Sequence, residues 1–265
     1  MAATAMAYLM ESASEGTRLK AKTDRQSVDE ELSLAGLRTG MRALDAGCAS
    51  GAVSVAMADQ VGPSGRVVGL ELSRERVREA KRDGESRSHL KFTQGSIDRL
   101  PFANGSFDFS LCRLVLEYIK NPQPFVDELV RVTKPGGRVA LIDVDGYGAF
   151  HHPLEGPRKA AIDVVQKLLA GAGFDAYIGR KLFSLLRRAG LSDIDVHVRP
   201  YHLIAGAATE AQLSNWRYKL DTLGPSARKA IGPAWDEHAA AMIDHLKDPD
   251  TLTYSSLFVV SGVRA

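Results

Sequence analysis

The pattern of hydrophobic and polar positions changes at about residue 41. Before it, Val28, Leu32, Ala35 and Gly36 recur at helical spacing and predict a helix in an amino-terminal arm over residues 1–40. After it, short apolar runs typical of strands buried on both faces alternate with longer amphipathic stretches. The runs cover residues 42–45, 66–70, 90–93, 107–112 and 138–143, and the stretches between them cover 52–60, 73–82 and 124–133.

Alternation of this kind predicts a parallel sheet whose crossover helices cover both faces. Residues 153–189 then read as helical with no strand between them, which predicts a helical lid inserted over the carboxyl edge of the sheet. A strand at 192–199, helices over 209–247 and a final strand at 253–263 complete the pattern.

The expected fold class is therefore α/β, with a Rossmann-like, seven-stranded, mostly parallel sheet. The helical lid would combine the amino-terminal arm with the insertion after the fifth strand, and residues 41–265 would form the main domain.

A glycine turn follows the first predicted strand, in the run Leu44-Asp-Ala-Gly-Cys-Ala-Ser-Gly51. Glycine lets a backbone approach a ligand closely, and turns at this edge of an open sheet bind ligands. Gly47 and Gly51 do not have the G-x-G-x-x-G spacing that cradles a dinucleotide pyrophosphate, and Asp45 suits a positively charged ligand better than a phosphate. The alternative is a plain strand-to-helix turn.

Glu71 ends the second predicted strand, about 20 residues beyond the glycine turn, where a carboxylate accepts both hydroxyls of a ribose. The alternative is a carboxylate that only favours the start of the next helix ahead of Ser73. Together with the glycine turn, Glu71 indicates a nucleoside ligand.

These motifs resemble those of the class I S-adenosylmethionine-dependent methyltransferases, in particular the ubiquinone and menaquinone biosynthesis branch, over about residues 40–145. The resemblance implies S-adenosyl-L-methionine as cofactor, with its methionine part over the turn and its ribose held by Glu71. It also places the adenine near the segment Gly95-Ser-Ile-Asp-Arg-Leu-Pro-Phe102. The cofactor-binding residues it implies are Asp45, Gly47, Cys48, Gly51, Glu71, Leu72, Ser96, Ile97 and Arg113.

Three positions depart from the family pattern. Ser96 replaces the usual acidic residue that faces the adenine, Ala49 replaces a common middle glycine, and Tyr118 stands where a histidine is common. None of these changes removes a group that methyl transfer needs.

His151 is the candidate catalytic base, because it and His152 follow the fifth predicted strand in a loop expected beside the cofactor. The alternative is that both are solvent-exposed loop histidines. Arg113 is expected to contact the cofactor carboxylate or shape its pocket, or else to form a surface ion pair. Cys112 and Arg113 stand where metal-dependent catechol methylation would need carboxylates or amides, so no metal is expected.

The arm and the insertion carry aromatic residues, namely Tyr8, Phe174, Tyr177 and Phe183, which would form an apolar lid or simply pack in the core. We therefore expect a small hydrophobic acceptor, natural-product-like or quinone-like. Two other hypotheses stay open: a cyclase or scaffold that uses the same fold without methyl transfer, and an NAD-dependent oxidoreductase.

Composition narrows the partners. A formal net charge of +2 with no long basic run argues against nucleic acid. The two separated cysteines, Cys48 and Cys112, suit a reduced cytoplasmic compartment. No run reaches the length of a membrane span, and the sequence leaves the oligomeric state open, a homodimer included.

Overall fold

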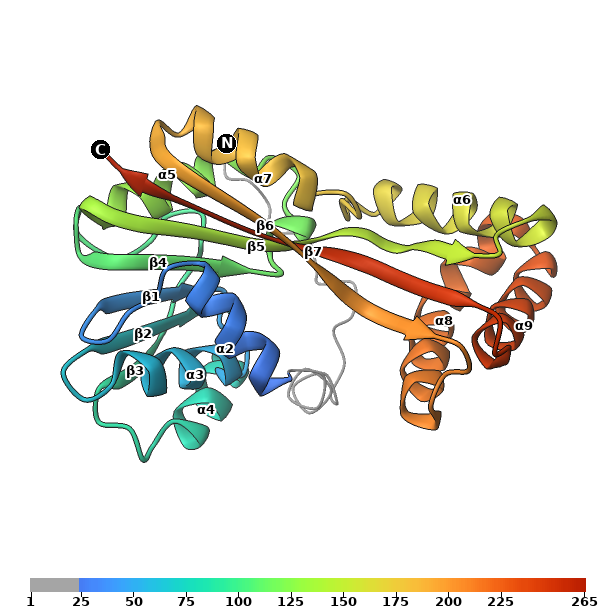
Figure 1. Ribbon diagram of the computed structural model, residues 1–265, viewed down its shortest axis with the longest axis horizontal. Helices are drawn as coiled ribbons and strands as arrows, with labels where there is room; N and C mark the ends of the chain where they lie inside the picture. Colours follow the sequence, from blue (N-terminus) through green and yellow to red (C-terminus); the bar gives the residue numbers. More distant parts are fainter. Residues whose placement is uncertain (1–23) are drawn as a thin grey trace.

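The computed structural model describes residues 24–265, so the expectations for Tyr8 and the earlier part of the arm lie outside the described residues. Seven strands form one sheet in the order β3-β2-β1-β4-β5-β7-β6 (Figure 1). The first five are parallel to one another, and β7 runs antiparallel to β5 and β6. The strands are β1 (Arg42–Ala46), β2 (Arg66–Glu71), β3 (Leu90–Gln94), β4 (Phe107–Arg113), β5 (Thr133–His152), β6 (Leu191–Ala205) and β7 (Leu252–Arg264). The expected Rossmann-like fold class is confirmed.

Helices cover both faces of the sheet, as the alternating pattern predicts. α2 (Arg25–Leu34), α3 (Ala52–Val61) and α4 (Arg74–Asp83) bury apolar side chains such as Leu32 and Met57 on one face. α5 (Gln123–Val132) and α7 (Leu182–Arg188) bury Leu129 and Leu186 on the other. The short helix η1 (Leu116–Tyr118) follows β4, and both η1 and η2 (Gly179–Lys181) contact the middle of β5 near Asp143 and Asp145. None of the helices within residues 24–265 has the length and apolar character that a membrane crossing requires.

The last three strands extend well beyond the rest of the sheet, since β5 has 20 residues, β6 has 15 and β7 has 13. Their far end carries a helical lobe of α6 (Gly156–Gly171), α8 (Glu210–Ile231) and α9 (Ala234–Lys247) (Figure 1). The core of this lobe includes Ile162, Trp216 and Leu246. The expected insertion over 153–189 is thus divided, because α6 joins the lobe while α7 packs on β5, β6 and β7.

β5 continues through a break in its pairing with β7, between Asp145 and Phe150. Gly146 has φ +74, and a Cβ there would lie 1.9 Å from the Phe150 ring. The Gly146-Tyr-Gly148 run therefore forms an irregularity within the strand. The prediction that His151 lies in a loop is wrong, because His151 is part of β5 and pairs with Thr253 of β7.

Candidate functional site

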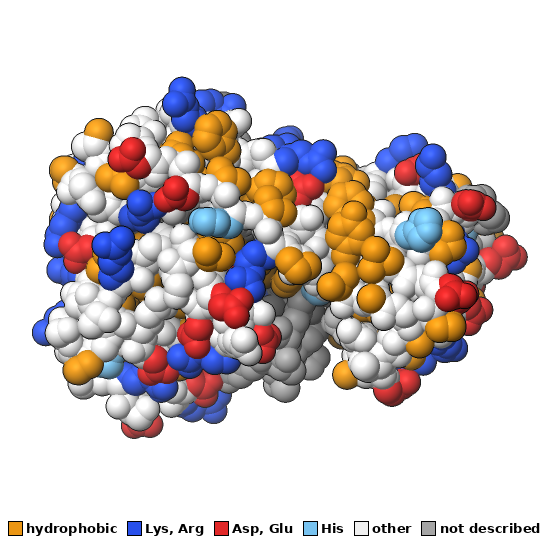
Figure 2. All heavy atoms as spheres, viewed as in Figure 1, with side chains coloured by type: hydrophobic (Ala, Val, Ile, Leu, Met, Phe, Trp, Pro, Cys, Tyr) orange, Lys and Arg blue, Asp and Glu red, His pale blue; other side chains and the backbone are white. Residues whose placement is uncertain are grey.

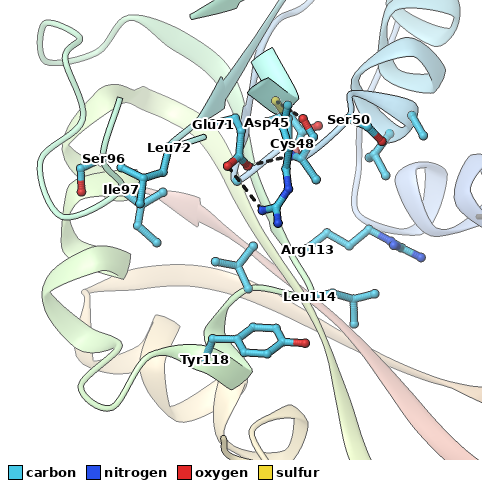
Figure 3. Close-up of a pocket in the computed structure, with 16 residues that line it drawn as sticks. Asp45, Cys48, Ser50, Glu71, Leu72, Ser96, Ile97, Arg113, Leu114 and Tyr118 are labelled. Atoms are coloured by element: carbon cyan, nitrogen blue, oxygen red, sulfur yellow. Dashed lines mark hydrogen bonds and ion pairs between the residues drawn. The ribbon is translucent and has the colours of Figure 1, made fainter. Parts of the chain in front are cut away.

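A cavity of about 240 Å³ lies at the carboxyl ends of β1, β2 and β4 (Figure 3). Leu72, Ser96 and Ile97 lie together on one side of it, Glu71 lies next to them, and Leu114 and Tyr118 lie across from them. All of the cofactor-binding residues expected from the sequence line this cavity except Gly51: Asp45, Gly47, Cys48, Glu71, Leu72, Ser96, Ile97 and Arg113.

The turn after β1 takes its shape from residues with positive φ. Gly47 and Gly51 both have φ +86. A Cβ at Gly47 would lie 2.7 Å from Val115, whereas one at Gly51 would meet Phe92 and Ala80 within 2.9 Å. Gly51 thus permits close packing behind the turn and does not line the cavity. Ala49 also has positive φ, 47, which explains why glycine is common at this position of the family pattern.

Glu71 is buried at the end of β2 and anchors the turn. Its Oε2 accepts a hydrogen bond from the Ala49 backbone N–H at 3.0 Å, and its Oε1 accepts one from Ser73 at 2.8 Å. Arg76 Nη1 lies 3.8 Å from Oε1. An ionised carboxylate has about four acceptor positions. Acceptor capacity therefore remains for the two hydroxyls of a ribose.

Asp45 is a fully buried carboxylate at the end of β1. Burial raises the pKa of Asp45 to about 6, although the hydrogen bond from Ser54 and the positive charge of Arg113 oppose the shift. Ser54 Oγ donates to Asp45 Oδ2 at 2.6 Å. A cationic group entering the cavity would favour the ionised form of Asp45.

Arg113 lines the cavity and forms an ion pair with Glu31 of α2, with Nε 2.7 Å from Oε2. The alternative prediction was an ion pair at the surface. Arg113 does form an ion pair, but it is buried, because the side chains of Arg113 and Glu31 are only 12% and 3% exposed. Glu31 was missed by the sequence reasoning. Its position on the apolar face of α2, between Val28 and Leu32, was the available signal.

His151 lies far along β5 and does not line the cavity. Its Nδ1 is 2.9 Å from the Thr253 hydroxyl, and its ring contacts Trp216 and His245 of the helical lobe. Burial lowers the pKa of His151 to about 4. The alternative of an exposed loop histidine is also wrong for His151.

The "Methyltransferase domain" family model matches residues 44–141. Demethylmenaquinone methyltransferase of Bacillus licheniformis is 30% identical over 181 residues, which cover 64% of this chain and 78% of that protein. The chain belongs to the class I S-adenosylmethionine-dependent methyltransferases.

Two other relatives align over less of their length. An uncharacterised transposon protein of Streptomyces fradiae is 34% identical over 58% of this chain and 44% of its own, and the Lactococcus lactis demethylmenaquinone methyltransferase is 36% identical over 40% and 42%. The chain thus spans under half the length of these two relatives.

Solved structures share the fold. The YcgJ protein of Bacillus subtilis gives a TM-score of 0.61 at 17% identity, covering 91% of this chain and all of that one. The [4+2]-cyclase SpnF gives 0.57 at 17% identity, covering 91% and 82%.

S-adenosylmethionine is the cofactor of this methyltransferase family, and the cavity fits it. A Cβ at Gly47 would collide with Val115, so only glycine leaves space between this part of the turn and Val115. Glu71 offers acceptors for a ribose, Asp45 offers a carboxylate for an ammonium group, and the apolar Leu72 and Ile97 offer surfaces for a base. Leu72 is 53% exposed, so its side chain is accessible to a ligand in the cavity.

Proposed function

We propose that this chain transfers a methyl group from S-adenosylmethionine to a small, hydrophobic, quinone-like acceptor. The observation that carries the proposal is Glu71, a buried carboxylate with spare acceptor capacity, in the same cavity as the Gly47 turn. The bound cofactor supplies a methyl group on a cationic sulfur, which leaves without acid assistance.

The residues of the chain then have two tasks, which are to orient the reactants and to exclude water. Glu71 would hold the ribose and Asp45 the amino-acid end of the cofactor. The apolar side chains of Leu114 and Val115, together with Tyr118, also line the cavity and would exclude water from it.

An aromatic cluster supports a hydrophobic acceptor. The ring centroid of Tyr118 lies 5.2 Å from that of Phe174, and Phe174 lies 5.4 Å from Tyr147. Phe174 in turn lines a second cavity of about 850 Å³, whose lining combines apolar side chains such as Tyr177 and Ile178 with polar ones such as Gln166 and Lys181. A flat, apolar ring system suits such surfaces. The names of the menaquinone relatives point the same way.

Calorimetry with S-adenosylhomocysteine tests the cofactor site. Glu71→Gln should weaken binding by about tenfold or more, since it removes charge-assisted hydrogen bonds to the ribose. Glu75→Gln is the matched control, because Glu75 is an exposed carboxylate in the first turn of α4 and does not line the cavity. Equal binding by the two variants would contradict the assignment of Glu71.

Transfer of a labelled methyl group to demethylmenaquinol and to a panel of quinols and phenols tests the acceptor class. Labelled quinol with stoichiometric S-adenosylhomocysteine is the expected result. A chain that binds the cofactor but forms no S-adenosylhomocysteine with any acceptor would favour the alternative of a cyclase on the same fold.

A further inference from the structure

β6 is an outer strand of the sheet, and β7 is its only strand neighbour within residues 24–265. An outer strand presents a row of backbone N–H and C=O groups that can pair with another strand. α7 packs on β6 but, as a helix, it covers a face and does not pair with the edge.

Among the described residues, four of the six exposed large hydrophobic side chains lie on β6 or β7. Val196 is 44% exposed and Val198 is 57% exposed on β6, and Tyr254 on β7 is 37% exposed. Val198 pairs with Phe258 of β7. Tyr254 lies four residues before Phe258 on β7, so the three side chains share one face of the sheet. Figure 2 shows hydrophobic atoms forming a band over the region of β6 and β7. An apolar band of this kind typically marks an interaction site.

The sequence of the edge is complementary to itself. The run Asp195-Val-His-Val-Arg199 has charges of opposite sign two residues on either side of His197, and a valine on each side between them. In an antiparallel pair related by a two-fold axis at His197, Asp195 lies opposite Arg199 and Val196 lies opposite Val198. Directly opposite pairs of these kinds stabilise a sheet.

We propose that β6 pairs with β6 of a second copy of this chain, joining the two sheets into one across a two-fold axis at His197. The charges continue beyond the strand. Asp195 already lies 2.9 Å from Arg138, and Arg199 bonds to Glu30 of α2. Pairing therefore forms an alternating row of Arg138 and Asp195 from one copy, then Arg199 and Glu30 from the other.

The ends of the paired segment are marked by breaks in register. β6 shifts against β7 between Ser192 and Asp195 and again between Tyr201 and Ile204. Asp193 and His202 at these breaks have positive φ, 44 and 51. The regular segment between them is short, and a two-fold axis uses the same edge of both copies, so the assembly closes as a dimer and does not extend into a fibre.

Charge reversal tests the pairing by sedimentation velocity on the full chain. Asp195→Arg alone and Arg199→Asp alone place like charges opposite each other and should raise the dimer dissociation constant by about tenfold or more. The double variant restores opposite charges across the axis and should return the constant to near the unsubstituted value. The intrachain pairs with Arg138 and Glu30 are not restored in the double variant, so recovery reports only on contacts between copies.

Cysteine trapping tests the register. His197→Cys places two thiols opposite each other across the axis, at a Cα separation of about 4.5–5.5 Å that a disulfide can bridge. Mild oxidation should link this variant to a covalent dimer. Ser192→Cys is the matched control on the same strand, because it has no cysteine opposite it in this register. The native Cys48 and Cys112 are buried.

A monomeric unsubstituted chain at micromolar concentration would overturn the proposal. So would a dimer whose dissociation constant is unchanged by both single reversals, or equal cross-linking of the His197→Cys and Ser192→Cys variants. Binding of S-adenosylhomocysteine by each variant, measured in parallel, shows that the chain has folded.

Discussion

Glu31 of α2 and Arg113 of β4 form a buried ion pair that joins the helix preceding the sheet to the wall of the cofactor cavity. Burial would lower the pKa of Arg113, but the negative charge of Glu31 and its hydrogen bond raise it overall. The guanidinium thus stays charged beside Asp45, which it also helps to ionise. A residue outside the cavity therefore sets the charge inside it.

Replacing Glu31 with glutamine should destabilise the protein strongly. Removing one partner leaves an uncompensated buried charge, which typically costs about 3–5 kcal/mol. Asp29→Asn on the same helix breaks an exposed pair with Arg25 and should cost less than about 1 kcal/mol. Urea unfolding measures both. Similar losses in the two variants would mean that the buried pair contributes no more than a surface pair.

Cofactor affinity should rise with pH through about 6. Asp45 has a raised pKa of about 6 and is therefore neutral below that pH. The ammonium group of S-adenosylhomocysteine favours the ionised carboxylate, so binding at pH 5 should be about tenfold weaker than at pH 7.5. Calorimetry at both pH values checks this, and Asp45→Asn should remove the difference. A pH-independent affinity in the unsubstituted chain would refute the role of Asp45.

Asp143 should make the free energy of unfolding fall as the pH rises. Burial raises the pKa of Asp143 to about 7, against 3.8 in an exposed carboxyl, while hydrogen bonds from the backbone of Val144 and Glu117 oppose the shift. The folded state thus binds more protons, and the stability that Asp143 contributes is present below pH 4 and is lost as the pH rises to about 7. Asp143→Asn should flatten the curve over this window in urea titrations. A curve of unchanged slope would contradict the assignment.

Gly146→Ala should destabilise the extended part of β5. A Cβ at this position meets the Phe150 ring at 1.9 Å and the residue has φ +74, so steric overlap adds to backbone strain, for about 3 kcal/mol together. Gly190→Ala is the matched control, because it has φ +80 and open space around its Cβ, and should cost only about 1–2 kcal/mol. Thermal unfolding of both variants measures the difference, and equal losses would show that Phe150 simply moves aside.

His151→Gln should reduce the turnover number far less than the loss of about 10²–10⁴-fold expected for a general base. His151 lies in the strand toward the helical lobe and hydrogen-bonds to Thr253. Its loss should lower the melting temperature without changing cofactor affinity. A collapse of turnover in a variant that still folds would restore His151 as the base.

Much of the part of the chain that forms β1 to β4 and the cofactor cavity could be predicted because its signals are local. The apolar runs indicate buried parallel strands. Gly47 and Glu71 each follow or end such a run, so they indicate a ligand-binding edge of the sheet without any knowledge of distant contacts. Glu31 and Arg76 could not be placed beside Arg113 and Glu71, since those contacts depend on how α2 and α4 pack. Ser96 lines the cavity as expected but bonds to Asp98.

The path of β5 beyond residue 145 could not be predicted from local sequence, for a different reason. Gly146 and Gly148 carry the usual composition of a turn, yet the partner strand β7, more than a hundred residues later in the chain, keeps β5 extended through them. Phe174 and Tyr177 pack in one cluster with Tyr118, whereas Phe183 lies on α7 and is exposed.

The position of β7 between β5 and β6 has a consequence for biosynthesis. Within residues 24–265, β7 is the only strand neighbour of β6 and of the outer part of β5, and β7 follows both of them in the chain. While the ribosome is still translating residues before 252, strands β1 to β4 can already pair with one another, but β6 and the outer part of β5 still lack their partner strand. A nascent chain arrested before β7 is therefore expected to be sensitive to proteases and a client of chaperones.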